Sequence, residues 1–140
     1  MELTLECKQA IVDFLVEVLE PQIIYLYGSF ARAEGRVDSD IDIAIYTEAE
    51  TGAYKLFLLA NQLAVSLKRD VELVELKNAS TVFRAQIISS GEALYYRNRA
   101  FKENYEVRAL KEYAKLNEER SAILQAVREG GSVYGIRCCS

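Results

Sequence analysis

Residues 27–46, YGSFARAEGRVDSDIDIAIY, decide the fold of this chain. An apolar run ends in Gly28-Ser29, and a second apolar run begins with Asp40 and Asp42, one residue apart. Successive side chains of a strand point to opposite faces, so the two carboxylates share a face and lie about 7 Å apart. Like charges this close repel each other, and a divalent cation between them removes the repulsion. The stretch therefore predicts two strands joined by a polar segment, with a metal site where the second begins.

The Gly28-Ser29 pair suits a phosphate group. Glycine lets the backbone approach a ligand closely, and Ser29 is a suitable N-cap for a short helix over residues 29–33, whose free N–H groups attract anions. A phosphate-binding turn beside paired oxygen ligands is typical of sites for Mg²⁺-assisted phosphoryl or nucleotidyl transfer. Such chemistry usually needs a third carboxylate to position or activate the nucleophile. Glu72 and Asp70, on a later predicted strand, are the candidates.

Composition narrows the chemistry further. The chain has 140 residues, 51% of them hydrophobic and 27% charged, which is typical of one globular domain. Its net charge of −4 argues against a dedicated nucleic-acid binder. There are no histidines, which excludes histidine acid–base catalysis, Ser-His-Asp hydrolysis and histidine-held zinc. A metal ion must therefore be held by oxygen atoms, which favours Mg²⁺ or Mn²⁺.

The three cysteines give no sign of a disulfide framework or a zinc site. Cys7 falls on the apolar face of the first predicted helix, and Cys138 and Cys139 are adjacent near the chain end, without metal-ligand spacing. We expect all three to be reduced and the protein to be cytoplasmic. The sequence shows no signal peptide and no apolar run long enough to span a membrane.

Hydrophobic periodicity predicts helices and strands in alternation. Helices are expected over residues 3–20, 29–33, 53–68, 81–90 and 101–128. Strands are expected over residues 22–27, 40–46, 71–76 and 93–96. The link between the first two strands is too short for a full crossover, so they should pair antiparallel in a mixed sheet. The prediction is an α+β fold with some α/β character: a small mixed sheet flanked by helices, with a long C-terminal helix. Residues 1–130 should form a single domain, and residues 131–140 a flexible tail.

These features resemble a known family. Gly28-Ser29, ten residues, and then Asp40-Ile41-Asp42 match the GS-x10-DxD signature of the polymerase-β-like nucleotidyltransferases. The small size and the strand over residues 71–76 are similar to the minimal nucleotidyltransferases (MNT). Among these the chain looks most like the MntA-type antitoxins of HepT/MntA (HEPN–MNT) toxin–antitoxin modules.

The resemblance implies a function and a set of roles. Such antitoxins use ATP and Mg²⁺ to transfer AMP to a tyrosine of a partner HEPN ribonuclease toxin, with which they form a hetero-oligomer. No direct nucleic-acid or membrane contact is implied. Gly28 and Ser29 would hold the triphosphate, and Asp40 and Asp42 would bind Mg²⁺. The third carboxylate, which would act in catalysis and bind the metal together with Asp40 and Asp42, falls on Glu72. The family usually has Asp there, so this chain departs from the pattern at this position.

Two other functions fit the same motif. One is an antitoxin that neutralises the toxin by binding alone, which the Glu72 departure allows. The other is a nucleotidyltransferase that modifies a small molecule such as an antibiotic. The second is disfavoured because the chain has no room for a separate substrate-binding domain.

Overall fold

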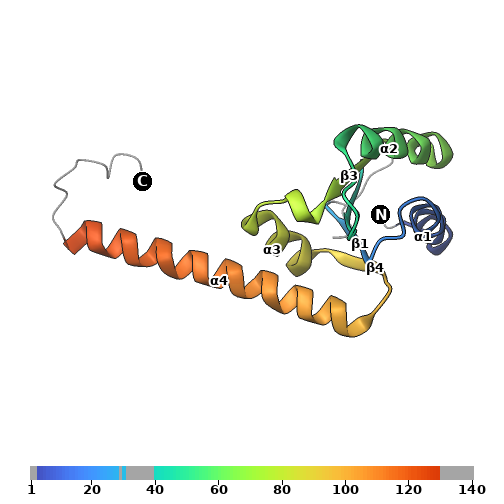
Figure 1. Ribbon diagram of the computed structural model, residues 1–140. Coiled ribbons are helices and arrows are strands. Elements are labelled where there is room, and N and C mark those ends of the chain that lie inside the picture. Colours follow the sequence, from blue (N-terminus) through green and yellow to red (C-terminus); the bar gives the residue numbers. More distant parts are fainter. Residues whose placement is uncertain (1–2, 29, 31–39, 130–140) are drawn as a thin grey trace.

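The computed structural model describes residues 3–28, 30 and 40–129. Four α-helices and four strands make up this part of the chain (Figure 1). The helices are α1 (Leu5–Leu19), α2 (Ala53–Leu67), α3 (Thr81–Ser90) and α4 (Arg99–Glu129). The strands are β1 (Ile23–Tyr27), β2 (Ile41–Tyr46), β3 (Val71–Glu75) and β4 (Glu92–Tyr96), and a short 3-10 helix, η1 (Leu76–Asn78), follows β3.

Each of the four α-helices and four strands begins and ends within two residues of its predicted bounds, whereas η1 was not predicted and takes Leu76 from the end of the predicted third strand. Capping explains two of the differences. The Thr4 hydroxyl accepts a hydrogen bond from the backbone N–H of Cys7 (3.1 Å), so α1 begins after Thr4. The Asn98 side chain accepts one from the backbone N–H of Phe101 (3.0 Å), and α4 begins two residues earlier than predicted. The predicted helix over 29–33, apart from Phe30, and the tail over 131–140 lie outside the described residues.

The four strands form one mixed sheet with the order β3-β2-β1-β4. β1 pairs antiparallel with both β2 and β4, whereas β2 and β3 are parallel and are connected through α2. The predicted antiparallel pairing of the first two strands is therefore confirmed. The parallel pair places the start of β3 beside the start of β2, where the two aspartates of the motif lie.

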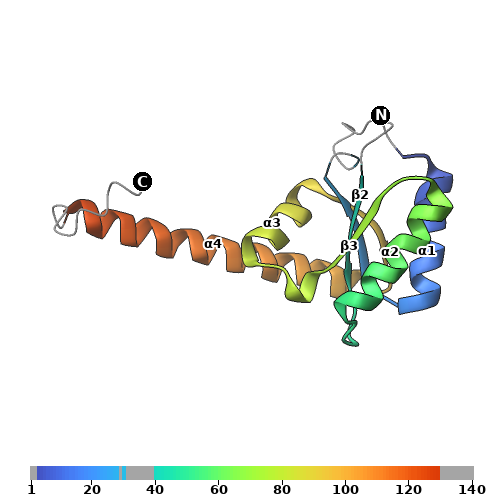
Figure 2. The same cartoon turned by 90° about the horizontal axis from the view of Figure 1, so that it is seen from above.

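Helices cover both faces of this sheet (Figure 2). Ile24 and Leu26 of β1 pack in the cluster that α1 and α2 complete, and Ile23 and Tyr25 pack in the cluster beneath α3 and the beginning of α4. The alternation follows from the two-residue period of a strand. The three isoleucines of β2 share the first face, as predicted, and are fully buried: Ile41, Ile43 and Ile45. The other side chains of β2, including Asp42, therefore point towards α3 and α4.

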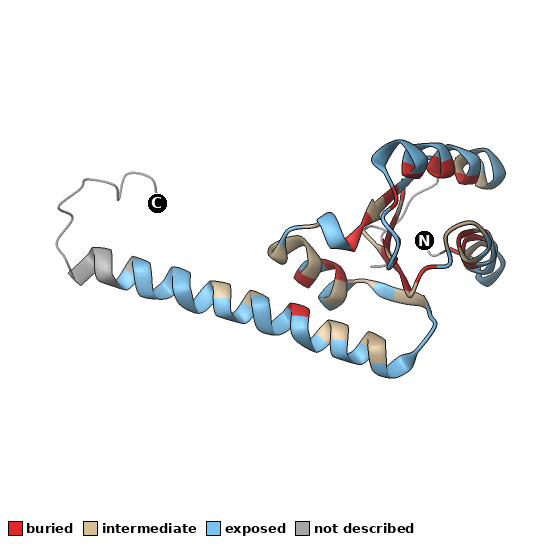
Figure 3. Cartoon of the chain, in the orientation of Figure 1, coloured by how far each residue is buried: buried red, intermediate tan, exposed pale blue. Residues whose placement is uncertain are grey.

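The long helix α4 is attached to the sheet by its first half only. The Tyr25 hydroxyl donates a hydrogen bond to the Glu106 carboxylate (2.7 Å), the Tyr105 ring lies 5.1 Å from that of Tyr46, and Ala109 is buried. The described side chains beyond this point are mostly exposed, and the helix projects away from the sheet (Figure 3). In the described part of the chain, no helix combines the length and the apolar character that crossing a bilayer requires.

Removing the Tyr25 hydroxyl should loosen α4 from the sheet. Tyr25→Phe leaves the partly buried Glu106 carboxylate without this donor, so we expect the free energy of unfolding to fall by about 1–2 kcal/mol. Urea unfolding followed by circular dichroism measures the change. Tyr96→Phe is the control, because Tyr96 is exposed and keeps its ring contact with Lys102. Equal losses in the two variants would contradict a specific role for the Tyr25 hydroxyl.

Candidate active site

The site begins where β1 ends, at Gly28. Its backbone has φ +76°, in the left-handed region that residues with a side chain rarely adopt. A Cβ atom at this position would overlap the carboxylate of Asp42. Glycine is therefore required here both by the backbone conformation and by the close approach of Asp42. Ser29, the other half of the predicted phosphate-binding turn, lies outside the described residues.

Strand register brings the carboxylate of Asp42 beside that of Glu72. Asp42 is paired with Tyr27 on one side and with Glu72 on the other, so the three residues form a row across β1, β2 and β3. Residues in register on adjacent strands point to the same face, which here is the face covered by α3 and α4. Asp42 is half-buried, and Glu72 is exposed.

The other two predicted carboxylates lie at the end of this row. Asp40 immediately precedes β2 and is exposed, two residues from Asp42 and of the same parity. Asp70 immediately precedes β3 and is also exposed, and its backbone carbonyl accepts a hydrogen bond from the N–H of Ile41 (2.9 Å). The acidic residues predicted from the sequence thus gather at one end of the β2–β3 pair.

The pKa of the Tyr27 hydroxyl depends on the negative charge on this face. Burial raises the pKa of the Tyr27 hydroxyl above its ordinary value, and the negative charges of Asp42 and Glu72 raise it further. Both carboxylates therefore act on the same group, which agrees with the strand register. The Tyr27 ring also packs edge-on against Phe83 of α3, with 5.5 Å between the ring centroids. The place of Tyr27 beside the two carboxylates follows from the strand register, which the sequence pattern alone does not show.

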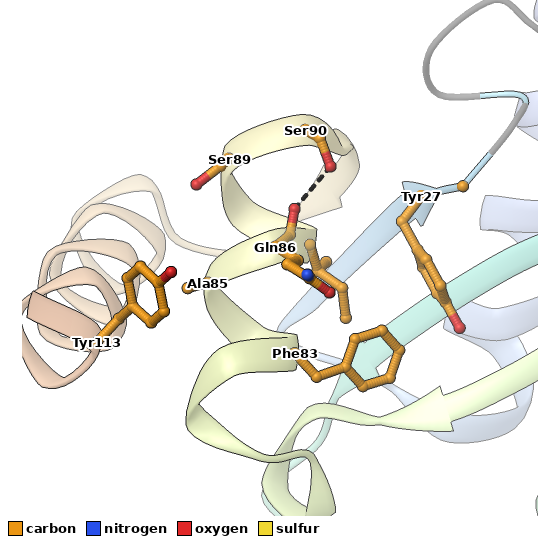
Figure 4. A pocket seen from close by; sticks show the side chains of 9 residues that line it. Tyr27, Phe83, Ala85, Gln86, Ser89, Ser90 and Tyr113 are labelled. Atoms are coloured by element: carbon orange, nitrogen blue, oxygen red, sulfur yellow. Dashed lines mark hydrogen bonds between the residues drawn. The ribbon is translucent and has the colours of Figure 1, made fainter. Parts of the chain in front are cut away.

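A cavity of about 410 Å³ opens next to Gly28. It runs from Tyr27 across α3 to Tyr113 of α4. Figure 4 shows these two tyrosines on opposite sides of α3. Phe83, Gln86 and Ser90 of α3 also line it. Its volume lies in the range that holds a nucleotide-sized ligand. These wall residues carry no functional signal in the sequence, because α3 and α4 show only helical periodicity. Packing of the two helices places them beside Gly28.

The side chains of the site limit how a metal ion can be held. Among the described residues, no group of three or more Asp, Glu or Cys side chains lies close enough together to hold one. Mg²⁺, however, is usually held by one or two carboxylates, with substrate phosphates and water completing its coordination. Asp40 and Asp42 offer two carboxylates of the required kind, and the missing side chain of Gly28 lets the Asp42 carboxylate lie against the end of β1. The residues present fit a substrate-assisted Mg²⁺ site better than a cage built from protein alone.

Comparisons with known proteins show which family the chain resembles. The family model described as polymerase beta, nucleotidyltransferase, matches residues 9–100. The protein adenylyltransferase MntA of Shewanella oneidensis is 36% identical over 106 residues, which are 76% of each chain.

Two solved structures resemble the whole described fold. A chain in a crystal structure of a toxin–antitoxin with AMP-PNP superposes with a TM-score of 0.77 and 33% identity, covering 86% of this chain and 98% of that one. A chain in a structure of the tri-AMPylated Shewanella oneidensis HEPN toxin in complex with the MNT antitoxin gives 0.72 and 31%, covering 88% and 97%.

Proposed function

Because the chain belongs to the polymerase β nucleotidyltransferase family, we propose that it is an antitoxin that transfers AMP from ATP to a tyrosine of a partner HEPN toxin. One observation in the structure carries the proposal: Asp42 and Glu72 lie in register on one face, and the missing side chain of Gly28 lets the Asp42 carboxylate approach the end of β1. The proposal places the protein in the cytoplasm, where ATP is available, in a hetero-oligomer with its toxin.

The residues have separate roles in this proposal. Gly28 and Ser29 bind the triphosphate, and the cavity along α3 receives the nucleoside, with the Gln86 amide as a polar contact. Asp40 and Asp42 would hold Mg²⁺, which neutralises the charge that develops on the phosphate oxygens. Glu72 orients the incoming tyrosine hydroxyl and accepts its proton.

The transfer is a substitution at the α-phosphorus of ATP. The tyrosine oxygen forms a bond to the α-phosphorus. The bond between the α-phosphorus and the oxygen that bridges to the β-phosphate breaks. Pyrophosphate leaves, AMP remains on the toxin, and the hydroxyl proton passes to the Glu72 carboxylate. The protein contributes chiefly position and charge, because phosphoryl groups react readily once they are aligned and neutralised.

The direct test uses the purified protein, its neighbouring toxin and ATP labelled in the α-phosphate. With Mg²⁺, the toxin should gain label and lose ribonuclease activity, and EDTA should prevent both. Absence of label on the toxin in the presence of Mg²⁺ would refute the proposed transfer.

Glu72 provides a second test of the same site. We expect Glu72→Gln to slow AMP transfer by about 10- to 100-fold, because the amide cannot accept the proton. Asp70→Asn is the matched control, since Asp70 is equally exposed and lies two residues away. Initial rates of label transfer measure both. A larger loss in Asp70→Asn would assign the third carboxylate to Asp70 instead.

Neutralisation by binding alone is the second candidate, and the longer Glu72 side chain in place of the family's Asp favours it. The variant Asp40→Ala/Asp42→Ala separates the two functions. If transfer protects the cell, this variant should fail to protect against the toxin although it still forms the complex. Full protection by the variant would establish neutralisation by binding.

A further inference from the structure

A second cavity, of about 200 Å³, lies on the same face of the sheet at the other end of β2. It is bordered by Tyr46, the last residue of β2, which lies four residues, or about 13 Å, from Asp42 along the strand. The remaining walls come from η1, α3 and α4, and include Lys77, Arg84 and Tyr105. None of its lining residues belongs to the proposed nucleotide site.

The Tyr105 hydroxyl has no hydrogen-bond partner among the described residues, although it is buried. Leaving such a group unpaired costs about 1–3 kcal/mol. Burial raises the pKa of Tyr105 to about 12, against the opposing effect of Arg84, so the hydroxyl keeps its proton at neutral pH. It is therefore a buried hydrogen-bond donor without an acceptor among the described residues, and it belongs to a residue that lines the cavity.

The other polar groups around this cavity are mainly cationic. Lys77, Arg84 and Arg108 line it with a single carboxylate, Glu112. Arg84 donates to the backbone carbonyls of Leu76 (2.9 Å) and Lys77 (3.0 Å), which fixes its guanidinium in place. Glu112 lies 3.7 Å from Arg84 and is about half exposed, so it offsets only part of this charge.

We propose that this second cavity binds a phosphate group, with the Tyr105 hydroxyl and the Arg84 and Arg108 guanidinium groups as its donors. An anion supplies the acceptor that Tyr105 lacks. It also balances the local excess of positive charge around this cavity, which contrasts with the net charge of −4 of the whole chain. The volume is below the range typical of whole small-molecule ligands, and suits a phosphate group with a few waters.

Helix α3 contributes lining residues to both cavities. Its Phe83 and Gln86 line the cavity beside Gly28, whereas its Arg84 lines the second one. A phosphate bound through Arg84 therefore contacts the helix that forms a wall of the proposed nucleotide site. This placement gives the second site a physical route by which its occupancy can alter nucleotide binding.

The test measures binding of inorganic phosphate to the full-length protein by calorimetry and thermal unfolding at constant ionic strength. Tyr105→Phe and Arg108→Gln should each weaken binding at least tenfold. Lys115→Gln is the matched control, because it removes the same charge from α4 about 10 Å further along and does not line this cavity. A phosphate ester titrated in parallel distinguishes a free ion from a phosphoryl group on a larger molecule.

Tyr105→Phe also separates a binding role from a structural one. Without phosphate, the variant should be as stable as the parent protein or more so, because it loses only an unpaired buried hydroxyl. With phosphate, its gain in melting temperature should be smaller than that of the parent. The proposal is overturned if phosphate does not bind saturably, or if binding is unchanged in both Tyr105→Phe and Arg108→Gln. Phosphate bound only in the cavity beside Gly28 would give that second result.

Discussion

Asp42→Asn should abolish AMP transfer, lowering the initial rate by at least about 100-fold. The substitution keeps the shape of the side chain but removes the negative charge that would hold Mg²⁺ against the triphosphate. Metal ions contribute several kcal/mol to stabilising such transition states, and each 1.4 kcal/mol corresponds to a tenfold change in rate. Transfer of labelled AMP to the toxin, measured at saturating Mg²⁺, checks this expectation.

Stability measurements make the Asp42 result specific. The variant should stay folded, because the amide keeps the shape of the side chain and relieves repulsion between Asp42 and its acidic neighbours. Asp13→Asn is the control: Asp13 is exposed on α1, and the Gln9 amide that bonds to its carboxylate can bond equally to an amide oxygen. A variant at Asp42 that folds, binds the toxin and still transfers AMP at the parental rate would rule out this residue as a metal ligand.

Gly28→Ala should damage the same site through the backbone. An alanine at φ +76° costs about 1–2 kcal/mol, and its Cβ atom would overlap the Asp42 carboxylate. The carboxylate must then move from its place in the row with Tyr27 and Glu72. We expect AMP transfer to fall by more than tenfold and the free energy of unfolding by about 1–2 kcal/mol, measured by label transfer and urea unfolding.

Gly52→Ala is the control for this prediction. Gly52 precedes α2, has φ −64°, and has open space where a Cβ atom would be added. Its substitution should leave transfer unchanged and alter stability by less than about 1 kcal/mol. If both variants lost activity equally, the conformation of Gly28 would not be the cause.

The types of the structural elements were predictable because their signals are local. The apolar spacing that predicts a helix over residues 53–68 is the spacing that buries Leu56, Ala60 and Leu63 against the sheet. The alternation in residues 40–46 likewise separates three buried isoleucines from Asp42. Both patterns depend only on backbone geometry, which is the same in every protein. Bounds were less certain, because single capping bonds such as that of Thr4 decide them.

The site was predictable only in part. The Gly-Ser and Asp-x-Asp spacing identified the end of β1 and the start of β2, since a turn and a strand can be recognised within twenty residues. The pairing of Asp42 with Glu72 depends instead on which strand packs beside β2. The strand register shows that Glu72 shares the face of Asp42. The role of Ser29 in phosphate binding and the roles of the carboxylates remain predictions.

By itself, the sequence determined a mixed sheet with helices, a glycine turn followed by two aspartates, and chemistry without histidine. The row formed by Tyr27, Asp42 and Glu72, and the place of α3 beside both cavities, follow from the tertiary structure and not from any local pattern. The unpaired hydroxyl of Tyr105 also became visible only there. The physical reason is that these features join residues far apart in the chain. Burial of apolar faces between α3, α4 and the sheet fixes their positions, and local patterns do not specify that packing.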